Sequence, residues 1–172
     1  PHTFELVTVR KARLDHHHAM LVSGGFFRVQ GFPGREVESF RSANEFTLEA
    51  TIRSETLEPE QSGEPAGIVT LSNAREGASF SLSQWGDQLM IRLRTSLTGP
   101  LGSEPMSLGR TSTSEPIHVI VSYRPGRLVG YVNGRAVLES DEVRGDLDDW
   151  PTDHLLQFGS GHGSAVDWDG NI

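Results

Sequence analysis

Residues 117–140, "IHVIVSYRPGRLVGYVNGRAVLES", alternate apolar and polar side chains and contain two short turn signals. Asn133-Gly134 favours a two-residue β-hairpin, because both central positions of a type I′ turn need positive φ, which Asn and Gly adopt at least cost. Pro125-Gly126 marks the other turn. The segment therefore predicts three consecutive antiparallel strands in a fixed register. We expect three alternate side chains of its first strand to face the core: Val119, Val121 and Tyr123.

The same period of two recurs along most of the chain, and no long helical stripe appears. In residues 46–54, the apolar side chains face opposite to Thr47, Glu49, Thr51 and Arg53. In residues 88–96, Leu89, Ile91 and Leu93 oppose Met90, Arg92 and Arg94. We expect further strands over residues 4–14, 19–32, 67–73, 79–84, 154–161 and 166–172 and near Met106, with one helical turn over 35–44. Ten or more short strands at this spacing predict an all-β sandwich or barrel.

Length and composition limit the classes of protein to which the chain can belong. Its 172 residues suit one domain, and the formal net charge of −8 argues against a nucleic-acid partner. It has no cysteine, which excludes disulfide scaffolds and thiol chemistry. No apolar run is long enough for direct membrane insertion. We expect residues 1–172 to form a single domain and to be a fragment of a longer chain.

Five segments in order carry a family resemblance: "FTLEATI", "GDQLMIRLRT", "HVIVSYRPGRLVGYVNG", "LLQFG" and "WDGNI". Over residues 26–172 the chain resembles the laminin-G-like, concanavalin A-like lectin and glucanase jelly-roll domains of secreted and surface proteins of bacteria. The resemblance implies a two-sheet antiparallel β-sandwich and an extracytoplasmic location. It also implies recognition of glycan or protein through loops at the rim, where related domains often hold calcium.

Trp85 is a candidate ligand-binding residue, because it falls in an expected turn at "QWGDQ" and would be exposed there. Its ring could equally fold over the end of the core. Arg92 and Arg94 face outward in the expected strand that follows. If this strand shared a sheet with the one carrying Glu49 and Arg53, the four charges could form a sugar- or carboxylate-binding ladder. Cross-strand ion pairing explains the same residues with fewer assumptions.

The acidic run "SDEVRGDLDDWPTDH" is a candidate calcium site, because calcium is bound by carboxylate and carbonyl oxygens on loops. The candidate ligands are Asp146, Asp148, Asp149 and Asp153. The spacing is not that of an EF-hand. The alternative is a solvated loop in which the aspartates cap turns and Trp150 folds back as a plug.

Two further groups combine polar and aromatic side chains. His16 and His18 would lie on one face if the segment were a strand, about 6–7 Å apart, and could bind zinc or copper with a third ligand. A polar strand end or a vector remnant is the simpler interpretation.

Asp167 and Asp169 flank Trp168, which could stack on a sugar. Alternation instead predicts that Trp168 is in the core and that both aspartates face outward.

No motif for catalysis is present. Retaining glycosidases need two carboxylates about 5–5.5 Å apart, and the Glu-x-Asp-x-x-Glu or Glu-x-Asp-x-Glu strand of glucanases does not occur. The segment 139–142, "ESDE", comes closest but lacks the second spaced Glu. We therefore expect a non-catalytic recognition or adhesion module that binds glycan or protein, with calcium as its one candidate cofactor. The alternatives are a structural domain that packs against a neighbouring domain of the same polypeptide, and a divergent glycoside hydrolase.

Overall fold

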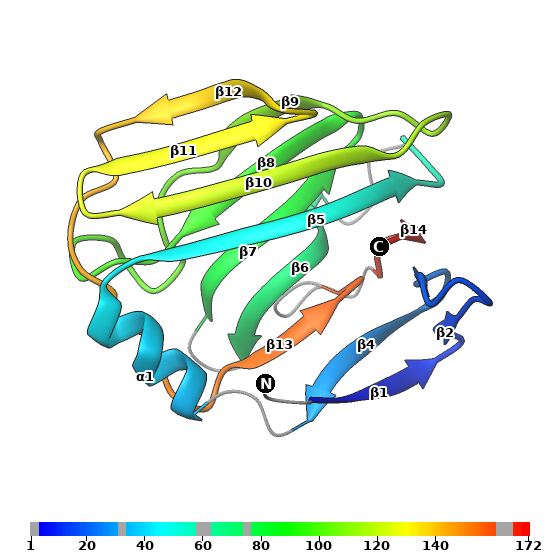
Figure 1. Cartoon of the computed structure of the whole chain (residues 1–172), viewed down its shortest axis with the longest axis horizontal. Helices are drawn as coiled ribbons and strands as arrows, with labels where there is room; N and C mark the ends of the chain where they lie inside the picture. Colours follow the sequence, from blue (N-terminus) through cyan, green and yellow to red (C-terminus); the bar gives the residue numbers. More distant parts are fainter. Residues whose placement is uncertain (1–3, 31–33, 58–62, 74–76, 161–166) are drawn as a thin grey trace.

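Two seven-stranded antiparallel sheets stack face to face in the computed structural model, which describes residues 4–30, 34–57, 63–73, 77–160 and 167–172 (Figure 1). The first sheet has the order β1 (Glu5–Arg10), β4 (Gly25–Gln30), β13 (Leu155–Phe158), β6 (Ala66–Asn73), β7 (Gly77–Trp85), β8 (Gln88–Leu93) and β9 (Met106–Arg110). The second has the order β12 (Arg135–Ser140), β11 (Arg127–Val132), β10 (Ile117–Arg124), β5 (Phe46–Ser54), β14 (Gly170–Asn171), β3 (Met20–Leu21) and β2 (Arg13–Leu14). The predicted all-β, two-sheet sandwich is confirmed.

The meander over residues 117–140 is confirmed as β10, β11 and β12. Asn133 and Gly134 have φ of 50° and 77°, as a type I′ turn requires. The side-chain amide oxygen of Asn133 also accepts a hydrogen bond from the backbone N–H of His118 at 2.8 Å. The turn is therefore fixed to the next strand of the sheet as well as to its own hairpin.

The predicted faces of the strands are also confirmed. Val119, Val121 and Tyr123 are buried, and so are Leu89, Ile91 and Leu93 from the opposite sheet. The side chains between them on β10 and β8 are half-buried or exposed. Alternate side chains of the two sheets therefore fill one shared core, as stacked sheets require.

The expected first strand, residues 4–14, is two strands. Its two parts, β1 and β2, belong to different sheets. Arg10, at the end of β1, has φ of 58°, a left-handed conformation that interrupts an extended chain. In the sequence the break shows only as two consecutive polar residues, Arg10 and Lys11, and the alternation resumes after them. The expected strand over residues 166–172 begins outside the described residues, and within 167–172 the strand is limited to the two residues of β14.

Helix α1 (Gly34–Ala43) covers one end of the core (Figure 1), where a single helical turn is expected. Its Val37 is fully buried, and the ring of Phe40 packs edge-on against Trp150 with the ring centroids 5.9 Å apart. Trp150 is also fully buried, and its indole N–H donates to the backbone oxygen of Arg94 at 2.8 Å. The role of Trp150 as a plug is therefore confirmed. In the described parts of the chain, no helix has the length and apolarity needed to cross a membrane.

Candidate functional site

The outer face of the β7–β8 hairpin brings together two of the predicted ligand-binding residues. The strand register pairs Ser81 with Arg92, Ser83 with Met90, and Trp85 with Gln88. The residues that alternate with these six along the two strands, such as Leu82, Leu89 and Ile91, are buried in the core. The six side chains of the three pairs therefore share the opposite, outer face of the hairpin. We call this set the Trp85 face: Ser81, Ser83, Trp85, Gln88, Met90 and Arg92.

Trp85 and Arg92 lie at opposite ends of the Trp85 face, about 13 Å apart along the strands. The side chain of Trp85 is 36% exposed, although most large apolar side chains of this chain are buried. Arg92 is half-buried. Neither side chain makes a hydrogen bond or an ion pair with any residue that the structure describes. Both are therefore available to an external partner.

Between Trp85 and Arg92 the face carries Ser83, which is buried, and its cross-strand neighbour Met90, which is half-buried. An indole ring can stack on the apolar face of a sugar, and a guanidinium can donate several hydrogen bonds to hydroxyl or carboxylate oxygens. An extended polar molecule with flat apolar faces is the ligand that this arrangement fits.

The position of Trp85 is fixed by its hairpin turn. Asp87 in the turn accepts a hydrogen bond from the Gln88 side-chain amide at 2.9 Å and forms an ion pair with Arg110 at 3.0 Å. The backbone oxygen of Asp87 accepts from the N–H of Thr111 at 2.8 Å. These contacts attach the turn to the end of β9, so Trp85 projects from a rigid element.

Arg94 is the first residue after β8. It is two residues beyond Arg92 along the chain and is therefore further from Trp85. Its backbone N–H donates to Ser79 at 2.8 Å, and its backbone oxygen accepts the indole N–H of Trp150. Arg94 also has a further interaction partner. The structure therefore places Arg94 at the margin of the Trp85 face, next to the plugged end of the core.

The proposed ladder of Glu49, Arg53, Arg92 and Arg94 is wrong. Glu49 and Arg53 are on β5 in the second sheet, whereas Arg92 is on β8 in the first. Glu49 instead contacts His118 across the strands at 2.8 Å, and Arg53 pairs with Glu55 at 3.5 Å. Alternation correctly identifies which side chains face outward, but it carries no information on which sheet a strand joins.

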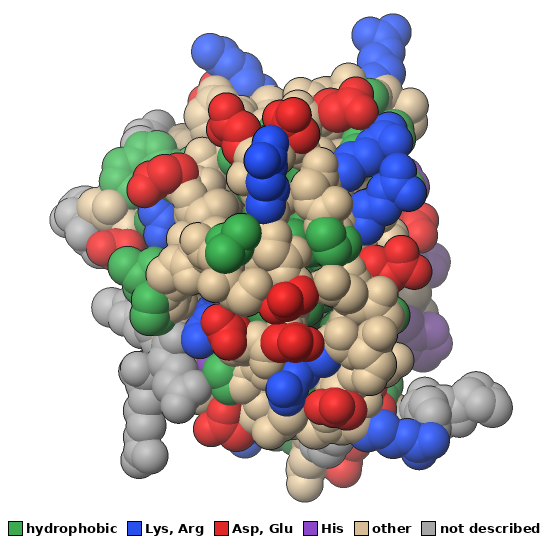
Figure 2. Space-filling model, turned by 90° about the vertical axis from the view of Figure 1, so that its left-hand side faces the viewer, with side chains coloured by type: hydrophobic (Ala, Val, Ile, Leu, Met, Phe, Trp, Pro, Cys, Tyr) green, Lys and Arg blue, Asp and Glu red, His purple; other side chains and the backbone are tan. Residues whose placement is uncertain are grey.

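The acidic run lies next to the C-terminal end of α1. Its Leu147 donates a backbone hydrogen bond to the side chain of Asn44 at 3.0 Å. Figure 2 shows acidic side chains gathered in the middle of this end of the sandwich. Asp146 Oδ1 accepts from the N–H of Asp148 at 3.3 Å, and Asp153 Oδ1 accepts from Asn73 at 3.2 Å. Asp149 is exposed.

Within the part of the chain that the structure describes, no three His, Asp or Glu side chains converge closely enough to hold a metal ion. The contact of Asp146 is that of a turn-forming residue, whereas Asp153 connects the run to Asn73 at the end of β6. Calcium binding by this run, including Asp148 and Asp149, stays a prediction from the sequence.

The histidine cluster is in a turn between β2 and β3, so the expected strand placement of His16 and His18 is wrong. Asp15 Oδ1 accepts from the backbone N–H of His17 at 2.8 Å and of Ala19 at 2.9 Å. The bond from Ala19 is the largest cause that lowers the pKa of Asp15, and the neighbouring His16 and His17 add to it. The carboxylate of Asp15 therefore organises this turn.

Trp168 is buried, as predicted, and its indole N–H donates to Oε1 of Gln84 at 2.7 Å. The aspartates beside it are half-buried rather than fully exposed. Asp167 pairs with Arg10 at 2.6 Å, and Asp169 Oδ1 accepts from the N–H of Gly24 at 3.2 Å. These contacts hold the C-terminal segment against the β1–β4 region. Trp168 is a core residue and is not available to stack on a sugar.

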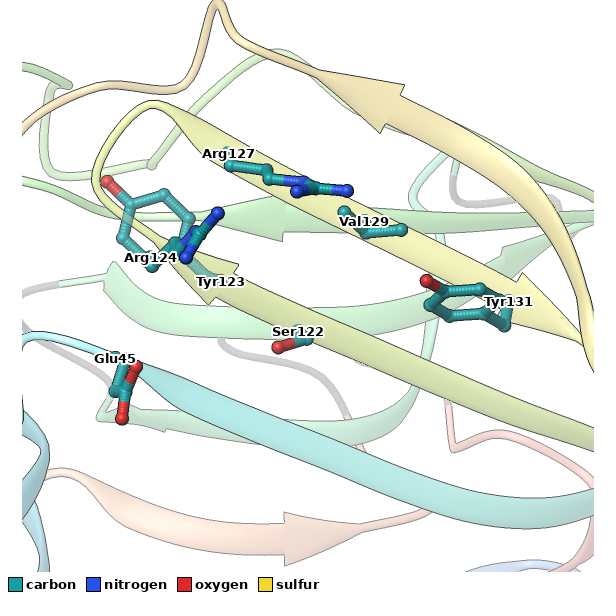
Figure 3. Close-up of a pocket in the computed structure, with 7 residues that line it drawn as sticks. All are labelled: Glu45, Ser122, Tyr123, Arg124, Arg127, Val129 and Tyr131. Carbon is teal, nitrogen blue, oxygen red and sulfur yellow. The ribbon is translucent and has the colours of Figure 1, made fainter.

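A second site lies on the outer face of the second sheet, and the sequence interpretation missed it. It is an open hollow of about 360 Å³, which we call the arginine hollow. Figure 3 shows Arg124 and Arg127 at one end and Tyr131 at the other, with Ser122 and Val129 between them. The remaining lining residues are Glu45 and Tyr123. The signal in the sequence was "RPGR", two arginines on either side of a two-residue turn.

The fold and the two surface sites define the class of protein: an all-β sandwich with polar and aromatic side chains exposed on both outer faces. No family model and no curated protein sequence matches the chain. Solved structures do match it, at sequence identities that establish the fold alone.

Domain 4 of AbnA, a GH43 extracellular arabinanase from Geobacillus stearothermophilus solved with arabinotriose, has a TM-score of 0.63 and 12% identity over 98% of this chain and 78% of that one. The CBM40 of a Ruminococcus gnavus sialidase, bound to α2,3 sialyllactose, has a TM-score of 0.57 and 14% identity over 76% of this chain and 75% of its own.

Two longer proteins contain the same fold. The binding domain of botulinum neurotoxin serotype D has a TM-score of 0.60 and 14% identity, and Trypanosoma rangeli sialidase with the inhibitor DANA has a TM-score of 0.63 and 19% identity. Each match covers 98% of this chain, which spans only 42% of the toxin chain and 26% of the sialidase chain. These neighbours agree with a jelly-roll sandwich of the kind found in carbohydrate-binding domains.

Proposed function

We propose that this domain is a non-catalytic recognition module that binds glycans on the Trp85 face. The observation that carries the proposal is that one face of one hairpin holds an exposed indole and, about 13 Å from it, a guanidinium with no partner among the described residues. An aromatic ring and a hydrogen-bond donor at this separation suit an oligosaccharide, because each pyranose ring has an apolar face and a hydroxylated edge.

The structural neighbours support the same proposal. Two of them are solved with oligosaccharides, arabinotriose in one and α2,3 sialyllactose in the other. The identities are too low to carry over any binding residue, so the site is argued from this chain alone. One neighbour belongs to an extracellular enzyme. This supports an extracytoplasmic location, which forms part of the proposal.

A glycan array probed with the wild-type domain tests the proposal. We expect binding to at least one class of neutral oligosaccharide, with loss of the signal in Trp85→Ala and weakening in Arg92→Gln. Arg13→Gln is a matched control, because Arg13 is an exposed cation on the other sheet. Absence of binding to any glycan, with and without calcium, would contradict the proposal and favour a structural domain that packs against a neighbour.

A hydrolytic role is tested separately. The binding proposal predicts that oligosaccharides recovered after incubation are unchanged in length. Release of reducing sugar that is abolished by substitution of one carboxylate would instead identify a glycoside hydrolase.

A further inference from the structure

The two arginines of the arginine hollow are directly paired across the β10–β11 hairpin. The register places Arg124 opposite Arg127, and both side chains are exposed. Like charges at paired positions of antiparallel strands destabilise a sheet. Departures from local stability rules of this kind are expected where a surface serves a function.

Among the described residues, one of the two charges is compensated by an ion pair and the other is not. Arg127 forms an ion pair with Glu139 at 3.2 Å, in which both side chains are largely solvated. Arg124 makes no ion pair or hydrogen bond with any of the residues that the structure describes, although Glu45 lines the same hollow. An anion placed between the guanidinium groups would relieve their repulsion and could accept two parallel hydrogen bonds from each.

The opposite end of the hollow is aromatic and uncharged. Tyr131 is four residues from Arg127 along β11, or about 13 Å, and it is half-buried. Its ring makes no hydrogen bond within the described residues. Val129, which lies between the two ends, faces outward and is nearly buried, so it forms an apolar floor. Figure 3 shows this order along the hollow.

We propose that the arginine hollow is a second glycan site and that it selects acidic oligosaccharides. The carboxylate of a uronic or sialic type of sugar binds between Arg124 and Arg127, and a following sugar ring lies against Tyr131. Glu45 accepts hydrogen bonds from hydroxyl groups at the charged end. The proposal rests on the proposed function, because both assume that the ligand is a glycan. The arginine hollow, however, lies on the second sheet, whereas the Trp85 face lies on the first.

An acidic sugar fits the hollow better than an acidic peptide does. β10 and β11 both lie inside the sheet, with hydrogen-bonded neighbours on each side, so no free strand edge is present to bind a peptide backbone. The hollow offers one cationic end and one aromatic end, which suits a ligand with a single carboxylate followed by an apolar ring face.

Isothermal titration of the whole domain with trigalacturonate and with neutral galactotriose tests the proposal. We expect the acidic trisaccharide to bind at least about tenfold more tightly, because hydrogen bonds to charged groups contribute more than neutral ones. Arg124→Gln and Tyr131→Ala should each weaken binding by about tenfold or more. Arg135→Gln should bind the acidic trisaccharide as the wild type does, because Arg135 is an exposed cation of the same sheet that does not line the hollow.

Thermal unfolding of Arg124→Gln separates loss of the site from loss of the fold. We expect an unchanged or higher Tm, since the substitution removes a like-charge pair; a lower Tm would contradict the repulsion argument. Equal binding of trigalacturonate by Arg124→Gln and wild type would overturn the proposal, and so would equal binding of an aspartate-rich peptide. If trigalacturonate does not bind while other glycans bind through Trp85, the second site is wrong and the proposed function stands.

Discussion

The indole N–H of Trp168 and the hydroxyl of Ser54 both donate to Oε1 of Gln84, each at 2.7 Å. The amide nitrogen of Gln84 donates to the backbone oxygens of Thr56 at 2.8 Å and Gly86 at 2.6 Å. Gln84 is 5% exposed, so its side chain joins both sheets and the β7–β8 turn inside the core.

Gln84→Leu should reduce the free energy of unfolding by about 1–3 kcal/mol for each buried donor left without an acceptor. Urea unfolding measures this loss. Gln30→Leu is the control, because Gln30 is exposed at the end of β4. Equal stability of the two variants would show that the network contributes nothing to the fold.

Two tryptophan substitutions should have opposite effects. Trp150 is fully buried against Phe40 and Phe46, with ring centroids 5.9 and 5.3 Å away. We expect Trp150→Ala to cost about 3–5 kcal/mol. Trp85→Ala should cost well under 1 kcal/mol, as surface substitutions usually do, while it abolishes binding of the neutral oligosaccharide selected on the array. Chemical unfolding and a binding assay on both variants check this; a large stability loss in Trp85→Ala would mean that its ring covers the core.

The pH dependence of stability should include a contribution from Tyr123. Burial raises the pKa of its hydroxyl, and the negative charge of Asp146 adds to the effect. The protonated hydroxyl donates to the backbone oxygen of Gly145 at 2.7 Å. Because the pKa in the folded state is above the unfolded value, this stability is present below about pH 10 and is lost as the pH rises through the folded pKa.

Tyr123→Phe should therefore flatten the alkaline limb of a plot of Tm against pH. An identical alkaline limb in the variant and the wild type would exclude this residue as the cause.

The calcium hypothesis predicts a rise in Tm in millimolar calcium, because a ligand stabilises the state to which it binds. Asp148→Asn and Asp149→Asn should then abolish the rise if these carboxylates are ligands. An unchanged Tm across the titration would contradict calcium binding and leave Asp146 with a turn-forming role and Asp153 with its bond to Asn73.

The sequence predicts much of the fold because its strongest signals are local. The alternation in β5, β8 and β10 and the turn at Asn133-Gly134 depend only on nearest neighbours, and all of them are confirmed. The break at Arg10 depends on one backbone angle that arginine seldom adopts, so no residue preference marks it.

The candidate sites were less predictable, because they depend on how distant strands pair. Trp85 and Arg92 share a face through a short hairpin, and this was accessible from the sequence. The separation of Glu49 from Arg92 follows from sheet order, which alternation does not encode. The segment "RPGR" is enough to predict that Arg124 and Arg127 face each other across a two-residue turn. The sequence does not show that they lie in a hollow that extends to Tyr131.

NMR can follow the indole N–H signals of the three tryptophans while a neutral glycan selected on the array is added, and so tests recognition on the Trp85 face. Trp150 and Trp168 are buried, and their N–H groups are bonded to Arg94 and Gln84. We expect one of the three signals to move on binding and this signal to be missing from Trp85→Ala. A bound neutral glycan that leaves the Trp85 signal in place would contradict recognition on this face.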